Sequence, residues 1–233
     1  MLCKVADLFV EIPAADGLER RCREYRAESV LPADLRIRRE GYRPEAWPTL
    51  DKEGMAYMES GLQFYVGLLG YGGLMLHASA VEYEGRAYLF SGPCGVGKST
   101  RSHLWEKQFG AVIFNDDKPA LRRVEEGWYA YGTPWCGKDG INRNRKVPLG
   151  GVCFLHRDDG RVQIDLLKPV RAVSSLMSQT LYQLWPRQMD RLLPLVERLI
   201  AEIPIFQMSG PPDRETATLC RDTMTRAAKE RFG

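Results

Sequence analysis

The sequence predicts an α/β fold, because apolar segments of strand character alternate with segments of helical character along most of the chain. The chain has 233 residues, enough for one or two domains with a buried core. Hydrophobic residues make up 44% and charged residues 27% of it, close to the averages of soluble globular domains. This composition excludes a disordered, a collagen-like or a coiled-coil protein.

Residues 1–54 are predicted to form a small α+β extension. Strands are expected at 3–12 and 35–38, and an arginine-rich stretch covers 19–43. Because acidic side chains alternate with the arginines, we expect a solvated, salt-bridged surface here, and the alternative is a docking face for an acidic partner. Pro44 and Pro48 mark the connection to the rest of the chain.

Residues 55–233 are predicted to form the core. A hairpin turn is expected at Glu84-Gly85, Pro169 is expected to begin a helix that continues to Leu184, and Pro186 to end it. The expected helices are 55–69, 99–109, 169–184, 189–202 and 214–231. The expected strands are 74–83, 87–90, 111–114, 120–124, 128–131, 151–155, 162–167 and 205–208.

Charge and cysteine usage limit the classes of partner. The net charge of +3 gives no general attraction to nucleic acid or to an anionic membrane. The six cysteines include no C-x-x-C pair, and the three histidines give no zinc-site spacing. We therefore expect reduced thiols and a cytoplasmic protein.

One uncharged segment, 60–81, is long enough to cross a bilayer. Its glycines at 70, 72 and 73 favour a turn that divides it into a helix and a strand. The first residues of the chain also lack the long apolar region of a signal peptide, so no membrane association is expected.

Residues 92–100 fit the pattern G-x-x-x-x-G-K-[ST] and lie between a predicted strand and a predicted helix, as this motif requires. Glycines let backbone N–H groups surround a polyphosphate, and the helix N-terminus adds positive potential. Lys98 is expected to contact the β- and γ-phosphates, and Ser99 to bind Mg²⁺. A glycine-rich turn without a ligand is the alternative. The expected phosphate-binding residues are Gly92, Pro93, Cys94, Gly95, Val96, Gly97, Lys98, Ser99 and Thr100.

Asp116 and Asp117 follow the strand expected at 111–114. Two ionised carboxylates about 4 Å apart would repel each other by roughly 4 kcal/mol at an effective dielectric of 20, and a bound cation would remove that cost. Neighbours on a strand point to opposite faces, so both reach one site only if the strand ends between them. The alternatives are a structural turn at 115–117 and neutralisation of the pair by Lys118.

Two further groups are candidates for the same site. His77 lies on the strand expected at 74–83, which precedes the strand that leads into the glycine-rich loop, and a satisfied core histidine is the alternative. A second loop, 132–145, concentrates glycine, proline and cations. Because positive charge near a transferred phosphoryl group stabilises its transition state, Lys138 and Arg143 are candidate contacts, with a solvated basic loop as the alternative. Trp135 is expected to pack on a ligand or to form an exposed lid.

The order of these motifs resembles the superfamily of HPr kinase/phosphorylase and phosphoenolpyruvate carboxykinase. The resemblance rests on H-A-S-A-V at 77–81, P-C-G-V-G-K-S-T at 93–100 and the acidic pair soon afterwards. A narrower similarity to small bacterial HPr kinase-related proteins includes 115–119 and 132–138. The resemblance covers about residues 55–210.

This resemblance implies a mixed-sheet core with a Walker A loop that binds ATP and Mg²⁺, with Mn²⁺ as the alternative metal, and by analogy a homo-oligomer. It implies Ser99, Asp117 and His77 as metal ligands and Asp116 as the general base, and an exchange of roles between the two aspartates stays open. The expected function is an ATP-dependent kinase that phosphorylates a hydroxyl group of a small protein, peptide or metabolite. A non-catalytic nucleotide-sensing module and a carboxykinase-type lyase are the alternatives, and GTP or pyrophosphate stays open as the donor.

Overall fold

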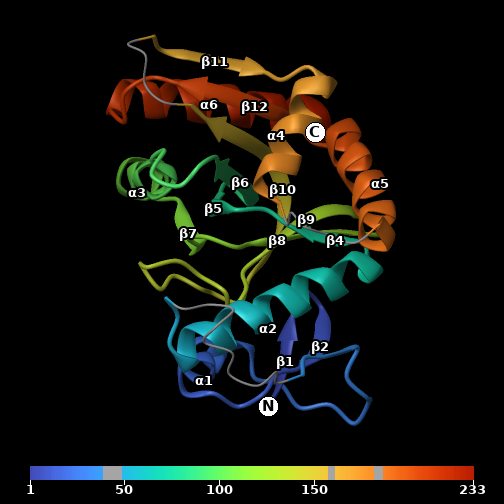
Figure 1. The fold of residues 1–233 in the computed structure, drawn as a ribbon. Coiled ribbons are helices and arrows are strands. Elements are labelled where there is room, and N and C mark those ends of the chain that lie inside the picture. The colour runs from blue at the N-terminus through green and yellow to red at the C-terminus, as the bar shows by residue number, and fades with distance from the viewer. Residues whose placement is uncertain (39–48, 157–160, 181–185) are drawn as a thin grey trace.

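A computed structural model describes residues 1–38, 49–156, 161–180 and 186–233 of the chain (Figure 1). These described residues form a nine-stranded sheet with helices on both faces and a separate three-stranded sheet near the N-terminus. The predicted α/β class is therefore confirmed.

The large sheet is mixed. Its strands are β4 (Gly73–Met75), β5 (Ala78–Tyr83), β6 (Arg86–Ser91), β7 (Val112–Asn115), β8 (Ala120–Val124), β9 (Gly127–Tyr131), β10 (Lys146–Leu155), β11 (Gln163–Leu166) and β12 (Ile205–Ser209). Their order is β4-β8-β9-β10-β6-β5-β7, and β12 pairs with both β10 and β11. Strands β6 and β12 run parallel to β10, whereas β9 runs antiparallel to it.

Alternation along the strands places apolar side chains on both faces of this sheet. Leu89 of β6 packs in the cluster that includes α4 (Pro169–Gln179) and α5 (Pro186–Glu202). Its neighbour Phe90 packs in the cluster of α3 (Lys98–Phe109) and α6 (Arg214–Phe232). The sheet therefore lies between two helical layers, and the loop that leaves β6 passes directly into α3 (Figure 1).

The N-terminal part packs on α2 (Lys52–Leu68). It comprises β1 (Leu2–Val5), β2 (Leu8–Glu11), α1 (Asp16–Arg21), the 3₁₀ turn η1 (Arg23–Tyr25) and β3 (Leu35–Arg36). The single strand expected at 3–12 is instead a hairpin, because Ala6 and Asp7 have φ of 52° and 62° and form a two-residue turn. α1 and η1 were not predicted. A domain boundary at residue 54 stays a prediction.

Three predicted boundaries in the core were wrong. The strand expected at 74–83 is divided into β4 and β5, which pair with different neighbours. β10 begins at Lys146 rather than at 151, since its first residues pair with β9 before the rest pair with β6. Pro186 begins α5 instead of ending α4; proline is tolerated there because the first N–H of a helix has no intrahelical acceptor.

Parts of the predicted extension and of one predicted helix are outside the described residues. α4 ends at Gln179. The predicted positions that lie outside the described ranges are Arg39, Glu40, Arg43, Pro44, Pro48 and Leu184.

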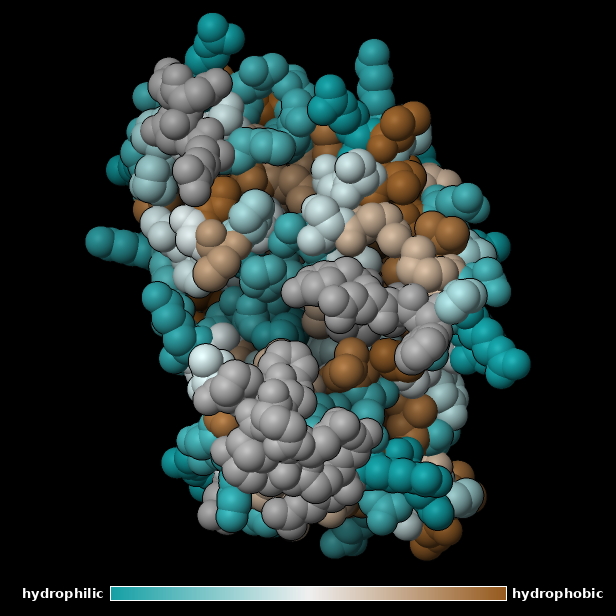
Figure 2. All heavy atoms as spheres, in the orientation of Figure 1, coloured by the Kyte–Doolittle hydropathy of each residue, from teal (hydrophilic) through white to brown (hydrophobic). Residues whose placement is uncertain are grey.

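No helix among the described residues is both long and apolar enough to cross a bilayer. The uncharged segment 60–81 is shared by α2, the 3₁₀ turn η2 (Leu69–Tyr71), β4 and the first residues of β5. On the face drawn in Figure 2, hydrophobic surface gathers over α4 and α5, where Val170 and Leu193 are exposed.

Candidate functional site

The glycine-rich loop, residues 92–97, joins β6 to α3. Gly92, Gly95 and Gly97 have φ of 142°, 78° and 102°, a region of backbone conformation that residues with a Cβ rarely adopt. α3 begins at Lys98, so the loop ends where helical N–H groups are free and the helix dipole favours an anion. The backbone of this loop therefore suits a polyphosphate.

The side chain of Lys98 folds back over the loop. Its Nζ donates hydrogen bonds to the carbonyl oxygens of Gly92 (2.9 Å) and Pro93 (3.2 Å), and the residue is 9% exposed. Burial lowers the pKa of Lys98, and the nearby charge of Asp117 opposes this shift. An ammonium group is thus held at the loop by neutral carbonyls, which an anionic ligand would replace as its partners. Ser99 is half-buried beside it.

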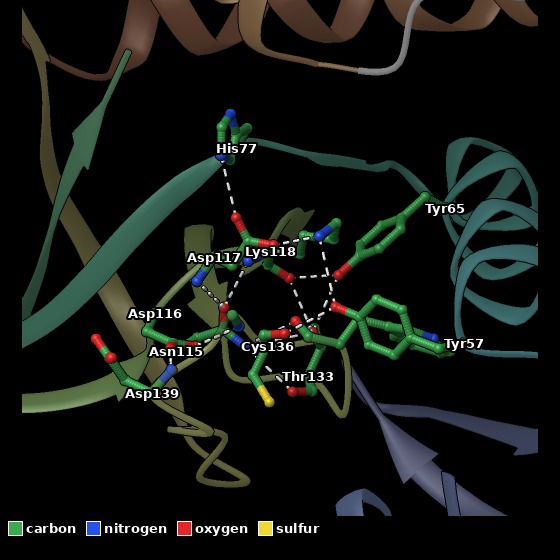
Figure 3. A network of polar contacts seen from close by, with 12 residues as sticks. Tyr57, Tyr65, His77, Asn115, Asp116, Asp117, Lys118, Thr133, Cys136 and Asp139 are labelled. Carbon is green, nitrogen blue, oxygen red and sulfur yellow. Dashed lines mark hydrogen bonds and ion pairs between the residues drawn. The ribbon is translucent and has the colours of Figure 1, made fainter. Parts of the chain in front are cut away.

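Asp117 is the acidic group that faces His77 and Lys118 (Figure 3). Its Oδ1 lies 3.1 Å from Nε2 of His77, and its Oδ2 accepts a hydrogen bond from Nζ of Lys118. Burial alone would raise the pKa of Asp117, but the hydrogen bond from His77 and the Lys118 charge outweigh it and lower the pKa to about 2. Asp117 is therefore ionised throughout the physiological range, and Lys118 partly neutralises it.

Asp116 points away from this pair and toward the second loop (Figure 3). Its two carboxylate oxygens accept hydrogen bonds from the backbone N–H groups of Gly137 (2.6 Å) and Asp139 (3.1 Å). Burial raises the pKa of Asp116, even though the Gly137 hydrogen bond acts in the opposite direction. The residue is 6% exposed. Asp116 therefore anchors the second loop to the end of β7.

Asn115 explains why the two aspartates diverge. β7 ends at this residue, and its Oδ1 accepts hydrogen bonds from the backbone N–H groups of Asp117 (3.1 Å) and Lys118 (2.7 Å). Its Nδ2 donates to the carbonyl oxygen of Thr133 (3.1 Å). Residues 115–118 therefore form a turn that the Asn115 side chain stabilises. The structural turn, which was the alternative to the acidic pair, is thus present together with that pair.

The second loop lies against both α3 and the N-terminal part. Oδ2 of Asp139 is 3.7 Å from Nε2 of His103 on α3. The carbonyl oxygen of Cys136 accepts hydrogen bonds from the Tyr57 hydroxyl (2.8 Å) and from Nη1 of Arg21 (3.3 Å). Lys138 and Arg143 are exposed, and the backbone N–H of Arg143 donates to Phe114 of β7 (2.9 Å). Lys138 and Arg143 thus lie on the second loop beside the acidic segment and do not contact Asp117.

Trp135 was predicted wrongly as an exposed lid or a ligand platform. It is 0% exposed and stacks on Phe64 of α2, with 4.7 Å between the ring centroids. Its Nε1 donates to the Ser60 hydroxyl (3.0 Å). The indole ring therefore fixes the second loop to α2.

Several residues around the acidic segment were not found from the sequence. Hydroxyl groups of Tyr65 and Thr133 donate to the carbonyl oxygen of Lys118, and Oε1 of Gln179 lies 3.2 Å from Nδ1 of His77. Tyr65 comes from α2, Thr133 from the second loop and Gln179 from the end of α4. No local pattern marks these residues, because each reaches the site through the tertiary fold.

A metal ion at the acidic segment would need further ligands, such as phosphate or water, in addition to protein side chains. The described residues contain no group of three or more His, Cys, Asp or Glu side chains arranged to hold a metal ion. Mg²⁺ is commonly bound by one or two protein oxygens together with phosphate and water. An ionised Asp117 and a Ser99 hydroxyl at the start of α3 fit that kind of site.

No family model and no curated protein matches this chain. Among solved structures, the chain is similar to the Hpr(Ser) kinase/phosphatase from Coxiella burnetii, with 11% sequence identity and a TM-score of 0.35. The match covers 66% of this chain and 90% of that chain. This is a distant similarity at the level of the fold.

Proposed function

We propose that the protein is an ATP-dependent phosphotransferase that transfers the terminal phosphoryl group of ATP to a hydroxyl group. The observation that carries this proposal is the placement of Lys98 and Asp117. Lys98 is held on a strand–glycine loop–helix unit, close enough to the half-buried, ionised carboxylate of Asp117 for that negative charge to act on the pKa of Lys98. A fixed cation and a carboxylate at one loop are the groups that phosphoryl transfer requires.

The phosphates of ATP would bind to the N–H groups of the loop and of the first turn of α3, and Lys98 would exchange its carbonyl partners for phosphate oxygens. Ser99 and Asp117 would hold Mg²⁺, which neutralises phosphate charge during transfer. The resemblance implied His77 as a further ligand. The contact between Nε2 of His77 and Oδ1 of Asp117 supports a different role, in which His77 orients Asp117.

During transfer, the bond between the γ-phosphorus and the ADP oxygen breaks, and a bond to the acceptor oxygen forms. The hydroxyl proton must pass to a base within hydrogen-bond reach. Asp116 was expected in this role, and its raised pKa suits proton acceptance. Its oxygens, however, are engaged with Gly137 and Asp139. The oxygens of Asp117 are engaged as well, with His77 and Lys118, and in the loaded site Asp117 would hold Mg²⁺. We therefore assign metal binding to Asp117, the positioning of the second loop to Asp116, and acceptance of the hydroxyl proton to an oxygen of the transferred phosphoryl group.

The second loop would lie beside the transferred group. Lys138 directly follows Gly137, whose N–H is bound by Asp116, and Arg143 is tied through its backbone to the end of β7. Both side chains are exposed and free to turn toward an anionic ligand. We propose them as contacts to the acceptor or to the transferred phosphoryl group.

The proposal is tested with γ-labelled ATP, Mg²⁺ and fractionated cell extract. The wild type is expected to transfer label to a protein or a small metabolite, and Lys98→Ala is expected to transfer none because ATP no longer binds. Lys107→Ala, at the other end of α3, is the matched control and should behave as the wild type.

Two results would contradict the proposed phosphoryl transfer. Tight ATP binding by the wild type without label transfer would favour a nucleotide-sensing module. Turnover of oxaloacetate with Mn²⁺ would favour a carboxykinase-type lyase.

A further inference from the structure

β11 is the edge strand of the large sheet and has a hydrogen-bonding neighbour on one side. Among the described residues it pairs with β12 alone, and Figure 1 shows it as the uppermost strand of the view. A free strand edge offers unpaired N–H and C=O groups to another strand, and proteins commonly protect such an edge with charged side chains or proline. β11 consists of Gln163–Leu166 and contains one charged side chain and no proline. Its edge is therefore available for pairing.

The hydrogen bonds to β12 identify the backbone groups that point to the free edge. The N–H of Leu167 donates to the carbonyl oxygen of Ile205 (2.7 Å), and the carbonyl oxygen of Arg161 accepts from the Ser209 hydroxyl (3.0 Å). In an antiparallel pair, a residue directs both of its backbone groups to one side, and the next residue directs them to the other side. The odd-numbered residues of 161–167 therefore face β12, and the backbone groups of residues 162, 164 and 166 point to the free edge.

An apolar stripe follows the same three residues. Side chains alternate between the two faces of a strand, so Val162, Ile164 and Leu166 lie on one face. Ile164 packs in the cluster of α3 and α6, whereas Val162 is 50% and Leu166 is 63% exposed. A largely apolar groove of about 380 Å³ borders Leu166 between α5 and α6. The edge of β11 thus combines free backbone groups with exposed apolar surface, a combination typical of a strand that pairs with another chain.

The strand is complementary to a second copy of itself about a two-fold axis at Ile164. Antiparallel pairing about this axis places Ile164 opposite Ile164 of the second copy, and Val162 opposite Leu166 of the second copy, so the exposed apolar side chains cover each other. Both residues of each of these pairs direct their backbone groups to the shared edge, so both hydrogen bonds of each pair can form.

The polar face of β11 fits the same axis. Gln163 lies opposite Asp165 of the second copy, so an amide donor meets a carboxylate. An axis at Asp165 would instead place two aspartates opposite each other, which is destabilising. An axis at Gln163 would no longer place Leu166 opposite Val162. The side chains therefore select the axis at Ile164.

We propose that the protein forms a two-fold dimer in which two β11 strands pair antiparallel and the large sheet continues from one copy into the other. The partner is a second copy of this chain because every feature of the edge has its complement in the edge itself, and self-complementarity is what a two-fold interface requires. This inference is independent of the proposed function, since β11 supplies no residue to the glycine-rich loop or to the acidic segment.

Sedimentation of the full chain over a series of concentrations measures the dissociation constant of the dimer. The wild type is expected to reach twice the mass of the chain. Leu166→Lys places an ammonium group opposite Val162 of the second copy and should raise the dissociation constant by about tenfold or more. Leu62→Lys replaces a leucine of α2 that is 49% exposed and is the matched control, which should stay within about twofold of the wild type. Unfolding curves verify that both variants fold.

Substitutions of Gln163 test the register of the two strands. Gln163→Glu brings a like charge opposite Asp165 of the second copy, whereas Gln163→Lys brings an opposite charge. Each pair occurs twice in the dimer, so we expect Gln163→Glu to raise the dissociation constant by about fivefold and Gln163→Lys to lower it by about fivefold. Both effects should become smaller at high salt concentration, because salt screens exposed charges.

Three results would overturn this inference. A wild type that stays monomeric at every concentration would show that the edge of β11 does not pair. A dimer that Leu166→Lys and Leu62→Lys leave equally intact would use another face of the molecule. Changes of the same sign in Gln163→Glu and Gln163→Lys would show that the strands do not pair about Ile164. Dissociation by Leu166→Lys, together with opposite effects of the two Gln163 variants, supports the proposed dimer.

Discussion

Nε2 of His77 lies 3.1 Å from Oδ1 of Asp117, although the two residues belong to segments far apart in the sequence. β5 begins directly after His77, β7 ends just before the acidic segment, and these strands pair with each other. The pairing therefore brings a histidine and a carboxylate together beside the loop that carries Lys98. Asp117 is the only residue of the described acidic pair that faces this histidine (Figure 3).

The ionised state of Asp117 should contribute to stability, and this contribution should depend on pH. Its pKa in the folded protein is about 2, against an ordinary value of 3.8. A lowered carboxyl pKa stabilises the fold above pH 4 and ceases to do so as pH falls toward 2. We expect Asp117→Asn to lower the free energy of unfolding by about 2 kcal/mol at pH 7.

Urea unfolding of the wild type and Asp117→Asn at pH 7, 4 and 3 checks this expectation. The difference between the two proteins should become smaller at the lowest pH, because the Asp117 carboxylate of the unfolded wild type, whose pKa is 3.8, then takes up a proton while that of the folded protein is still ionised. A difference that is independent of pH would mean that the carboxylate charge does not stabilise the fold.

The glycine-rich loop could be predicted from the sequence because its determinants are local. The glycines, Lys98 and the flanking strand and helix all lie within one short segment. The resemblance implied that His77 and Asp117 lie at one site, as ligands of one metal ion. No local pattern indicated their direct contact, since it depends on β7 pairing with β5. Trp135 was predicted wrongly for the same reason. The composition of the second loop indicated that Trp135 is exposed. Instead, α2, which is distant in sequence, covers the indole ring.

The two aspartates should differ in their effect on phosphoryl transfer. Asp117→Asn removes the ionised group that faces His77 and Lys118, and we expect a loss of about 100-fold or more in transfer rate. Asp116→Asn keeps one carbonyl oxygen as an acceptor for the second loop, so a smaller loss is expected. Label transfer under single-turnover conditions, with ATP affinity measured separately, gives both values. The opposite order of effects would assign the proton acceptor to Asp116.

Arg21 should act on the site through the second loop. Its guanidinium donates to the carbonyl oxygen and Sγ of Cys136 and lies 4.8 Å from the Tyr57 ring centroid. Removing this side chain takes away the contact of α1 with Cys136 and leaves the phosphate loop untouched, while Nδ2 of Asn142 still donates to the backbone carbonyl oxygen of Arg21 (2.8 Å). We therefore expect Arg21→Ala to reduce transfer by about tenfold through misplacement of the loop, at unchanged ATP affinity.

Arg20→Ala is the matched control for this prediction. Arg20 is the neighbouring residue and forms an exposed ion pair with Glu53 at 3.3 Å. Exposed ion pairs contribute little to stability, so this variant should transfer at the wild-type rate. Equal losses in the two variants would show that the effect comes from α1 in general and not from the contact with Cys136.

Gly61 should be required for the packing of Trp135. A Cβ at Gly61 would lie 2.9 Å from Cδ1 of the fully buried indole ring. Alanine in a helix is favoured over glycine by about 1 kcal/mol, whereas overpacking a core costs about 1–3 kcal/mol. Because a stacked indole cannot move aside easily, we expect Gly61→Ala to lower the melting temperature. A Cβ at Gly67 in the same helix would approach the half-buried side chain of Leu35, whose flexible end would lie 2.8 Å (Cδ2) and 3.2 Å (Cδ1) away. Thermal unfolding should therefore give a lower melting temperature for Gly61→Ala than for Gly67→Ala. The reverse order of melting temperatures would show that the contact between α2 and the second loop tolerates an added methyl group.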